Sequence, residues 1–449
     1  MSVERLSPWQ WREEILTAVT PPRSVDTVPL EQARGRVLAA AVRSPEQVPA
    51  LPIAAMDGFA VRRADLTAPG TTVLPVAAEL PARPGEVPDL PSGSAARIMT
   101  GAPVPRGADA VVEVEATDSD PFGPAPAVVA LALESLPVPG RHVRGAGEEI
   151  PLDAPLALAG DRVGAGLVGL ARTLGIDALE VLRPLRVAVV VTGDELTADS
   201  SSDRPGADPL PGAVRESNGT MLAAALAADG AHALPPRHCG DDPADLRETL
   251  DIAAGEADLV LTTGGIGHGA YDVVKLLLGE RGAGTSRFVH LALRPGGPQG
   301  RGTLPGGVPV VHLPGTPVGA LVGYHLFVRP LLDRDGAAPR RMLLGGEGDG
   351  LRRGPAGTVH ALPGRREIAA DGREVVHLVP GRRLAPYGRA DSMVLLESEG
   401  PDGGGTDDSG TGPDGGAAAN GWTEADGPTE AGSGELASAP ERSVLVLAL

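Results

Sequence analysis

Residues 185–195 read LRVAVVVTGDE, and residues 259–269 read LVLTTGGIGHG. Each stretch begins with a nearly continuous apolar run, which is typical of a strand buried on both faces of a parallel sheet. Alternation of such strands with helices predicts an α/β sheet with right-handed crossovers over residues 185–333. The other elements expected there are helices at 221–228, 243–254, 273–278 and 318–331, and strands at 232–234, 287–293 and 308–313.

The segments on either side have a different pattern. Helices are expected at 7–18 and 30–41, and residues 48–139 contain short strand-like runs separated by glycine and proline, which predicts a β-rich unit. From residue 340 the chain again reads as short strands and turns, and residues 443–449 (SVLVLAL) form a last strand-like run. A chain of 449 residues has room for three or four domains of about 150 residues or fewer.

Residues 397–441 differ from the rest of the chain. Their 45 positions hold 11 acidic residues, 12 glycines and no Lys or Arg. Such a composition buries too little apolar surface to offset the entropy of ordering, so we expect a disordered loop insertion before the final strand. Without its 11 negative charges the net charge of the chain changes from −19 to −8.

The composition argues against several classes of protein. The single cysteine, Cys239, excludes a disulfide framework and a cysteine zinc site. The net charge of −19 argues against nucleic acid as a partner. No apolar run reaches the roughly 20 residues that span a bilayer, and the acidic N-terminal residues do not resemble a signal peptide. We therefore expect a cytoplasmic protein without membrane or nucleic-acid partners. Lys275 is the only lysine, so arginine has replaced lysine almost everywhere.

The strand ends are the places where a ligand is expected, because open α/β sheets bind ligands outside the carboxyl ends of their strands. Residues 262–269 form a glycine-rich loop before a helix that begins near Asp272. Glycines allow backbone N–H groups to approach an anion, and the helix dipole adds to this attraction. The loop matches neither a P-loop nor a GxGxxG motif. The alternative is a tight turn in which Asp272 is only an N-cap.

Carboxylates at the neighbouring strand ends suggest a magnesium site. Asp194 and Glu195 follow the first strand and could bind Mg²⁺, although a solvated loop start is the alternative. Asp241-Asp242-Pro243 reads as a helix cap with Pro at the first helical position, and capping can coexist with metal binding. His268 is either a ligand or base or, more simply, an exposed loop residue. The histidines lack metal-ligand spacing, so no dedicated zinc site is expected.

Two stretches in the β-rich unit read as turns. Residues 55–61 (AMDGFAV) contain the Asp57-Gly58 pair, which from turn chemistry alone favours a hairpin turn. Residues 97–105 (RIMTGAPVP) read as a strand that ends at a rigid turn after Thr100.

Seven segments in register resemble the MoeA family, the molybdopterin molybdenumtransferases, which include the E domain of gephyrin. The resemblance covers residues 10–396, and the final strand at 443–449 fits the end of the family's C-terminal barrel. The segments are AMDGFAV at 55–61, MTGAPVP at 99–105, GEEI at 147–150, TGDEL at 192–196, GGIGHG at 264–269 with Asp272, RPG at 294–296, and LPGTP at 313–317.

This resemblance implies a multidomain fold of α/β and β parts. A discontinuous N-terminal domain at 1–47 and 140–184 would carry a β-rich insertion at 48–139. A MogA-like α/β molybdopterin-binding domain would follow at 185–333, and a C-terminal β-barrel domain at 334–449 with the disordered acidic insertion at 397–441. Members of the family are homodimers whose cleft is formed by the third domain of one subunit and the second domain of the other.

The resemblance also implies a function in molybdenum cofactor biosynthesis. The enzyme would insert molybdate into adenylylated molybdopterin and release AMP, with Mg²⁺ as the metal ion. Other cofactor-biosynthesis proteins are possible further partners. Two rivals remain: a paralogue that carries molybdopterin without inserting metal, and an adenylyltransferase, whose catalytic domain shares the α/β fold but would consume ATP.

Family roles carry over to matching residues. The resemblance places Asp57, Thr100, Glu195, Asp241 and Asp272 among the polar cleft residues, and Glu149 at a position that is usually Asp. As a hypothesis, Glu195, Asp241 and Asp272 would hold Mg²⁺, and Arg294 with loop N–H groups would hold oxyanions. The pterin and phosphate-binding loops would comprise Gly264, Gly265, Gly267, Pro314, Gly315, Thr316 and Pro317.

The departures from the family pattern lie where oxyanions should bind. The usual Lys-Pro-Gly-Lys-Pro is Arg294-Pro-Gly-Gly297-Pro298, so the second cation is missing. The usual Leu-Pro-Gly-Asn-Pro-x-Ser ends in Gly319 and has Thr316 in place of Asn. Serines of the family are replaced by Ala54 and Gly267. Arg301 or His268 would then be candidates to substitute for the lost groups.

Overall fold

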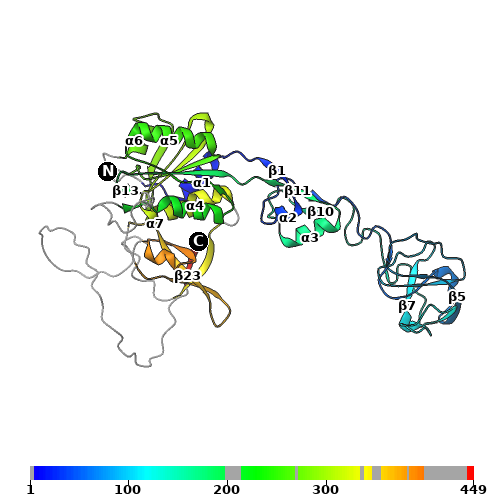
Figure 1. Cartoon of the computed structure of the whole chain (residues 1–449). Helices are drawn as coiled ribbons and strands as arrows, with labels where there is room; N and C mark the ends of the chain where they lie inside the picture. Colours follow the sequence, from blue (N-terminus) through cyan, green and yellow to red (C-terminus); the bar gives the residue numbers. More distant parts are fainter. Residues whose placement is uncertain are drawn as a thin grey trace, which may run out of the picture. The chain divides into compact units, whose positions relative to one another are not determined.

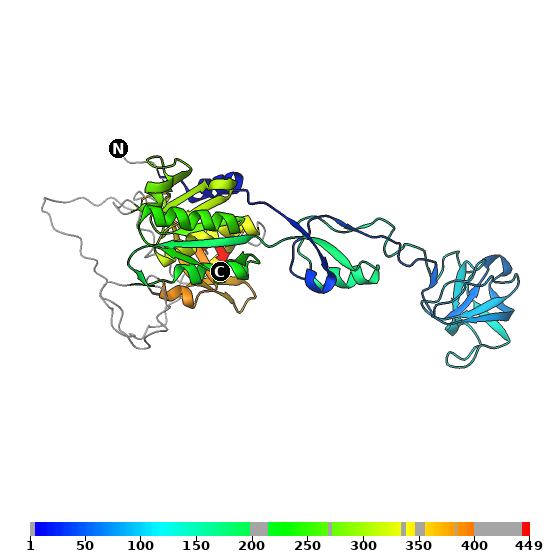
Figure 2. The ribbon, with the colours of Figure 1, turned by 45° about the horizontal axis from the view of Figure 1, so that its top comes forward.

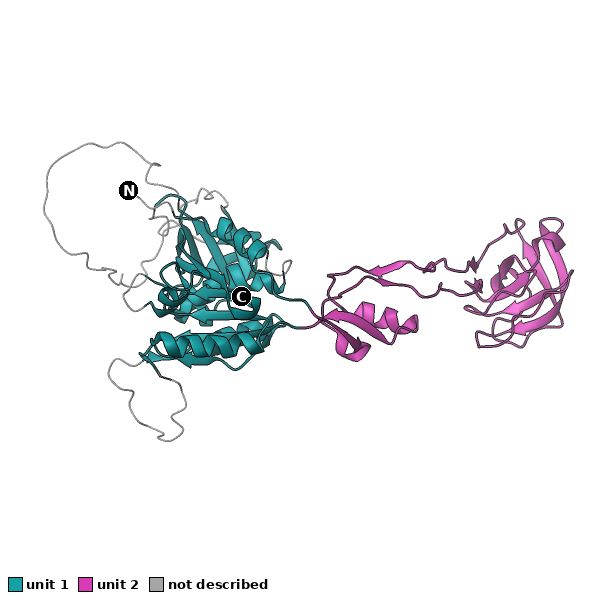
Figure 3. Cartoon of the chain, turned by 90° about the horizontal axis from the view of Figure 1, so that it is seen from above, with its two compact units in different colours: residues 1–23, 184–449 teal, residues 24–183 magenta. Residues whose placement is uncertain are grey.

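The computed structural model describes residues 5–197, 214–267, 272–333, 338–345, 355–381, 384–398 and 442–449 (Figure 1, and turned in Figure 2). The chain separates into two compact units, unit 1 with residues 1–23 and 184–449, and unit 2 with residues 24–183 (Figure 3). His268 and nearly all of the acidic segment 397–441 lie outside the described residues. No helix in the described ranges is long and apolar enough to cross a membrane.

Unit 1 is built around a seven-stranded sheet. Its strand order is β15 (His232–Ala233), β12 (Arg186–Thr192), β17 (Leu259–Thr263), β21 (Pro309–Leu313), β20 (Pro298–Thr303) and β18 (Ser286–His290), with β16 (Arg237–Cys239) also paired to β12. β12, β17 and β21 are parallel, with Val189 opposite Leu261 and Leu261 opposite Val311. All of β17 and β21 is buried, which confirms the parallel core predicted from the apolar runs.

Helices cover both faces of this sheet. α5 (Pro243–Glu256) and α6 (Val273–Leu278) pack on one face, and α4 (Asn218–Ala228) and α7 (Pro317–Gly323) lie on the other (Figure 1). The helix expected at 318–331 is interrupted by a wider π-helical turn at Tyr324–Val328 before α8 (Arg329–Leu332). Pro330 has no N–H to donate to the preceding turn, which explains the break in the regular hydrogen-bond pattern.

The antiparallel edge of the sheet differs from the prediction. The strand expected at 287–293 is split into β18 and the short β19 (Leu293–Arg294), which pairs with β23 (Val359–Ile368) instead. β20 was not predicted because its sequence, PQGRGT, has no apolar run. Its glycines are explained by contacts: a Cβ on Gly300 would lie 2.6 Å from the Phe288 ring.

Helix α1 (Pro8–Ala18) belongs to unit 1, whereas the predicted first domain began at residue 1. Ser7 caps the helix by accepting a hydrogen bond from the Trp9 N–H, and the Gln10 side chain accepts one from the Ser7 N–H. Trp11 and Ile15 are fully buried in the core of unit 1. The sequence alone could not assign this apolar face to a partner, and the structure assigns it to the core of unit 1.

The C-terminal part of unit 1 is a closed five-stranded β-barrel. Its strands run in the order β23, β24 (Glu374–Leu378), β22 (Arg340–Gly345), β26 (Arg442–Ala448) and β25 (Ser392–Glu397), and β25 pairs back with β23. Val376 and Val394 lie in its core. The predicted β-barrel is therefore confirmed.

Unit 2 contains a five-stranded sheet in the order β7 (Ala110–Glu113), β4 (Gly58–Val61), β6 (Ala95–Ile98), β5 (Gly70–Leu80) and β8 (Val128–Leu133). Strands on either side of this stretch pair with each other: β1 (Val25–Pro29) with β11 (Ala178–Leu182), β2 (Val42–Arg43) with β10 (Pro155–Ala157), and β3 (Ile53–Ala54) with β9 (Val143–Arg144). The chain thus leaves and returns around a β-rich insertion, although the boundaries of the four domains stay predictions.

The second helical segment of unit 2 follows this return of the chain. α3 (Ala165–Thr173) packs with α2 (Leu30–Ala33), which is shorter than the predicted 30–41. The chain leaves the helical conformation at Arg34, whose ψ is 130°, and Gly35 follows with φ +78°.

Candidate functional site

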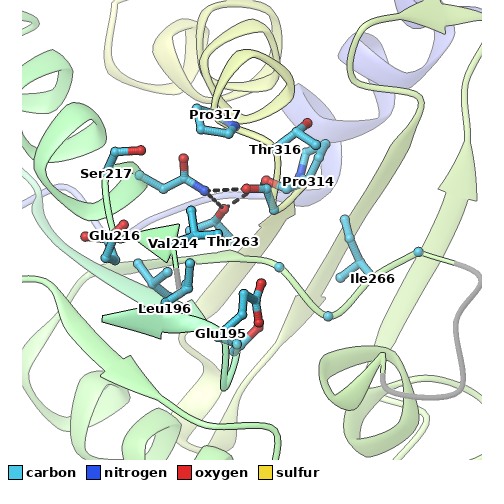
Figure 4. A pocket seen from close by; sticks show the side chains of 18 of the residues that line it. Glu195, Leu196, Val214, Glu216, Ser217, Thr263, Ile266, Pro314, Thr316 and Pro317 are labelled. Atoms are coloured by element: carbon cyan, nitrogen blue, oxygen red, sulfur yellow. Dashed lines mark hydrogen bonds between the residues drawn. The ribbon is translucent and has the colours of Figure 1, made fainter. Parts of the chain in front are cut away.

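A cavity of about 680 Å³ lies in unit 1 at the carboxyl ends of β12, β17 and β21. Figure 4 shows Glu195, Thr263, Ile266 and Thr316 around it. The three strands end at the same edge of the sheet, so their loops converge there. The predicted residues on its lining are Glu195, Asp241, Gly264, Gly265, Gly267, Asp272, Pro314, Gly315, Thr316 and Pro317.

The glycine-rich loop is pressed against the end of β12. Gly264 and Gly265 have φ values of +99° and +63°, a region that residues with a side chain rarely adopt. A Cβ on Gly264 would lie 2.7 Å from both the carbonyl oxygen and the Oγ1 of Thr192. A Cβ on Gly315 would lie 3.2 Å from the Gly264 Cα. The three loops therefore meet at backbone distance, which leaves no room for side chains at these positions.

Residues at the start of α6 hold this loop. The Gly267 N–H donates to Asp272 Oδ1 at 2.8 Å, and Lys275 Nζ donates to the Gly267 carbonyl at 3.2 Å. The Lys275 backbone N–H also donates to the Gly265 carbonyl at 3.0 Å. Asp272 precedes α6, but its side chain makes no capping hydrogen bond to the helix. Asp272 thus occupies the N-cap position, as the alternative interpretation expected, but its side chain accepts the Gly267 N–H instead of capping the helix.

Asn218 was not predicted and ties two of the loops together. Its Nδ2 donates to Thr263 Oγ1 and to the Gly315 carbonyl, both at 2.8 Å, and Thr263 Oγ1 donates to the Pro314 carbonyl at 2.8 Å. These bonds fix the orientation of the amide, since both partners of Nδ2 must accept. The helix predicted at 221–228 does not include Asn218, which the structure places at the start of α4. Within the described residues, Asn218 Oδ1 and Thr192 Oγ1 are buried without a hydrogen-bond partner.

Carboxylates gather on the other side of the cavity. The Asp241 N–H donates to Asp194 Oδ1 at 3.1 Å, which brings the ends of β12 and β16 together. Partial burial raises the pKa of Asp241, and the negative charges of Asp194, Glu195 and Asp272 raise it further, against a hydrogen bond from the Asp194 N–H. The capping role falls to Asp242, which accepts from the Ala244 N–H at 2.7 Å with Pro243 at the first helical position.

These carboxylates fit a weakly preorganised magnesium site. In the described part of the chain, no group of three or more His, Cys, Asp or Glu side chains is arranged to hold a metal ion. Mg²⁺ usually keeps several waters and binds through one or two carboxylates together with substrate phosphates, so a complete protein cage is not required. The negative charges of Asp194, Glu195 and Asp272 contribute to the raised pKa of Asp241, and a bound cation would relieve this repulsion.

Arg294 is not part of this lining. It lies in β19, opposite His360 of the barrel, and its side chain is exposed. Burial lowers the pKa of His360, and the charge of Arg294 lowers it further. Gly296 and Pro298 do line the cavity, whereas a Cβ on Gly297 would lie 2.8 Å from His290 Nε2. The His290 ring therefore fills the space beside Gly297, where the side chain of the family's second cation would begin.

Arg301 does not substitute for that cation in this cavity. Its guanidinium lies 2.7 Å from Glu14 Oε1 of α1, and the residue lines a neighbouring cavity. Arg301 therefore lies outside the described lining of the first cavity. His268, the other candidate, lies outside the described residues.

Asp57 and Thr100 meet in unit 2. Asp57 Oδ1 accepts from the Thr100 N–H at 2.6 Å and from its hydroxyl at 2.7 Å, and these bonds lower the pKa of Asp57. The hairpin interpretation of Asp57-Gly58 is wrong, because β3 pairs with β9 while β4 pairs with β6 and β7. Thr100 follows β6 at a turn, as predicted. Glu149 is exposed, and its backbone N–H donates to the Val48 carbonyl at 3.0 Å.

Comparisons with known proteins agree with this architecture. A family profile described as the MoeA N-terminal region (domain I and II) matches residues 6–175, and one described as a probable molybdopterin binding domain matches residues 188–334. The structure of a molybdopterin biosynthesis MoeA protein from Pyrococcus horikoshii superposes with a TM-score of 0.70 at 25% identity, covering 88% of this chain and 95% of that one. The fold and its cavity thus define a molybdopterin-binding class of protein.

Curated relatives establish the family. Molybdopterin molybdenumtransferase 2 of Mycobacterium tuberculosis is 41% identical over 326 residues, which are 71% of this chain and 75% of that protein. Molybdopterin molybdenumtransferase of Haemophilus influenzae is 31% identical over 323 residues, 72% of this chain and 76% of that protein. The chain belongs to the MoeA family of molybdopterin molybdenumtransferases, a family of molybdenum cofactor biosynthesis.

Proposed function

We propose that the protein inserts molybdate into adenylylated molybdopterin and releases AMP in a magnesium-dependent reaction. The observation that carries this proposal is the single cavity that unites the glycine-rich loop, the Leu313–Pro317 turn and the carboxylates Glu195, Asp241 and Asp272. The relatives are named molybdopterin molybdenumtransferases, which supports the same reaction class.

The loops would bind the anionic substrate. Close backbone approach at Gly264 and Gly315 leaves the surface free of side chains, so a phosphate or pterin can approach the backbone of the loops, although the Gly264 N–H itself donates to the Leu313 carbonyl at 3.2 Å. Asn218 holds the Thr263 and Gly315 backbones in register and thus keeps the two loops at a fixed separation. A rigid binding surface is what positioning of the substrate requires.

The carboxylates would hold the metal ion. Bound Mg²⁺ would neutralise charge on the phosphates of the adenylylated substrate. Asp241 and Asp272 would supply ligand oxygens, with Glu195 as an outer partner. Water would cleave the phosphoanhydride bond, so that AMP leaves with one phosphate and the pterin keeps the other. The hydrogen bonds from Thr100 lower the pKa of Asp57 and keep its carboxylate ionised. Asp57 would act on the substrate together with Glu149 and Arg294, from other parts of the cleft that the family shares between subunits.

A carrier that binds molybdopterin without inserting metal is the second candidate. It is favoured by two observations: Gly297 supplies no cation, and Arg294 is absent from the described lining of the cavity. Loss of oxyanion neutralisation would spare pterin binding and reduce molybdate insertion.

The two candidates separate in an AMP-release assay. The purified chain is incubated with adenylylated molybdopterin and Mg²⁺, with and without molybdate, and AMP is measured by chromatography. We expect AMP only when molybdate and Mg²⁺ are both present. Bound pterin with no AMP at any molybdate concentration supports the carrier, and consumption of added ATP supports an adenylyltransferase.

A further inference from the structure

A second cavity of about 910 Å³ adjoins the first in unit 1. Gly267 and Asp272 line both cavities, so these two residues lie at the boundary between them. The second cavity lies between α6 and the antiparallel pair β18 and β20. Of its other residues, only Arg301 is a predicted candidate for binding oxyanions.

The two cavities carry opposite charge. Among the described lining residues, the first cavity has four carboxylates, Glu195, Glu216, Asp241 and Asp272, and one cation, Arg215. The second has four cations, Lys275, Arg281, Arg287 and Arg301, and two carboxylates, Asp272 and Glu280. Without a bound cation, the side chains of the first lining repel a free oxyanion and those of the second attract one, whereas a divalent cation has the opposite preference.

Two of the four cations are already paired. Arg287 Nη1 lies 2.6 Å from Glu14 Oε2 and Arg301 Nη2 lies 2.7 Å from Glu14 Oε1, so both guanidinium groups share one carboxylate of α1. These ion pairs fix the wall of the cavity. The two guanidinium groups and the carboxylate of Glu14 together carry a net charge of one positive unit.

Lys275 and Arg281 have no carboxylate partner in the part of the chain that the structure describes. Lys275 Nζ donates only to the Gly267 carbonyl among the described residues, which leaves two of its three protons available. Arg281 makes no hydrogen bond or ion pair with any residue that the structure describes. Lys275 is also the single position where lysine, a compact point charge, is present instead of arginine.

We propose that this second cavity binds a tetrahedral oxyanion, such as molybdate or phosphate, between Lys275 and Arg281. The ammonium is fixed by the Gly267 carbonyl at the wall of the first cavity, so the anion binds beside the site where the carboxylates attract Mg²⁺. Separation of the two ligands in adjoining cavities avoids placing an oxyanion among four carboxylates. The binding itself is independent of the reaction, and only its role in supplying molybdate rests on the proposed function.

The single lysine allows a direct test. Reductive ¹³C-methylation of the whole chain labels Lys275 and the N-terminal amine, and each gives its own NMR signal. Sodium molybdate or phosphate is then added at constant ionic strength, with chloride as the reference salt. We expect a saturable shift of the Lys275 signal with either oxyanion, with mutual competition, and no saturation with chloride.

Matched variants identify the site. Arg281→Ala removes an exposed cation, and we expect it to weaken oxyanion binding on the order of tenfold, the effect of losing one charge-assisted hydrogen bond. Arg247→Ala, which removes an exposed cation from α5, should bind as the unchanged chain does. Calorimetric titration of the unmethylated proteins with molybdate checks that the label does not create the result.

The inference is overturned if the unmethylated chain binds neither oxyanion saturably in the calorimetric titration, or if its affinity is the same in Arg281→Ala and Arg247→Ala. The proposed function can fail separately. If the chain binds molybdate in an Arg281-dependent manner but releases no AMP, the second binding site is supported and the proposed insertase reaction is contradicted. For an active chain, Arg281→Ala should raise the KM for molybdate and leave kcat nearly unchanged.

Discussion

Asp272 combines two tasks in one side chain. One carboxylate oxygen accepts the Gly267 N–H at 2.8 Å, and the residue lines both cavities. Replacement by Asn keeps an acceptor for the Gly267 N–H and removes the negative charge. The variant therefore separates the structural task from the proposed binding of Mg²⁺.

We expect Asp272→Asn to lower AMP release on the order of 10²–10³-fold, because a preorganised charge near the reacting phosphate is lost. Pterin binding and thermal stability should change little. Asp251→Asn, which removes an exposed carboxylate from α5, is the matched control and should retain full activity. Equal AMP release from Asp272→Asn and Asp251→Asn would remove Asp272 from the metal site and leave the family assignment intact.

Asp241 gives a prediction about pH and metal. Its pKa is raised in the folded protein by burial and by neighbouring carboxylates. The neutral form is thus favoured by folding, so its contribution to stability is present at low pH and is lost as the pH rises through the folded pKa. At neutral pH the ionised group destabilises the metal-free protein.

Mg²⁺ should reverse this effect. We expect Asp241→Asn to raise Tm in EDTA at neutral pH, and MgCl₂ to raise Tm more for the unchanged chain than for the variant. As the pH falls, the gain from MgCl₂ should disappear at a higher pH than for a carboxyl with an ordinary pKa. The measurement is thermal unfolding followed by circular dichroism. An equal Mg²⁺ effect on both proteins contradicts a role of Asp241 in metal binding.

At the scale of elements, the close approach of β12, β17 and β21 depends on Gly264. We expect Gly264→Ala to destabilise the protein by about 1–3 kcal/mol, because φ is positive and the Cβ would overlap the Thr192 carbonyl. Gly255→Ala is the matched control: it lies in α5 with no atom within 4 Å of its Cβ position. That change should stabilise by about 0.5–1 kcal/mol. Urea unfolding of both variants checks the sign, and a stable Gly264→Ala contradicts the loop packing.

The elements also show what the sequence could predict. β12, β17 and β21 are buried on both faces, so their apolar runs identify them without any knowledge of the fold. The strand ends then point to the cavity. β20 could not be found in this way, because Gly300 and Gly302 are determined by contacts with Phe288 and Ser286 of the paired strand.

Pairings between distant segments account for the other differences. Asp57-Gly58 reads as a hairpin locally, but the partners of β4 are β6 and β7. Arg294 follows a predicted strand, yet β19 pairs with the barrel strand β23 and so turns away from the cavity lining. The role of Asn218 can be recognised only when the position of Gly315 is known, and Gly315 lies about a hundred residues later in the chain.

At the scale of the whole molecule, the family resemblance predicts a homodimer. Asp57 and Thr100 lie in unit 2, and the carboxylate-lined cavity lies in unit 1. A cleft shared between subunits would use both sets of residues. Light scattering of the purified chain should give about twice the 45.5 kDa subunit mass. A monomer at micromolar concentration contradicts the shared-cleft proposal.

A dimer with a shared cleft also predicts complementation between two inactive variants. Asp57→Asn and Asp272→Asn should each be inactive alone. The two variants are mixed, unfolded and refolded together, so that heterodimers form. Each heterodimer has one cleft with both changes and one cleft with neither. In a random mixture about a quarter of all clefts are therefore intact. Recovered activity near that level supports the shared cleft, and no recovery in a proven mixed dimer contradicts it.

The most direct test of the proposed function is the stoichiometry of the reaction. The purified chain is incubated with adenylylated molybdopterin, Mg²⁺ and molybdate; AMP is measured by chromatography, and molybdenum bound to the pterin is measured by mass spectrometry. We predict one AMP released for each molybdenum inserted, and neither product when molybdate or Mg²⁺ is omitted. Tightly bound pterin that acquires no molybdenum and releases no AMP under the same conditions contradicts the account.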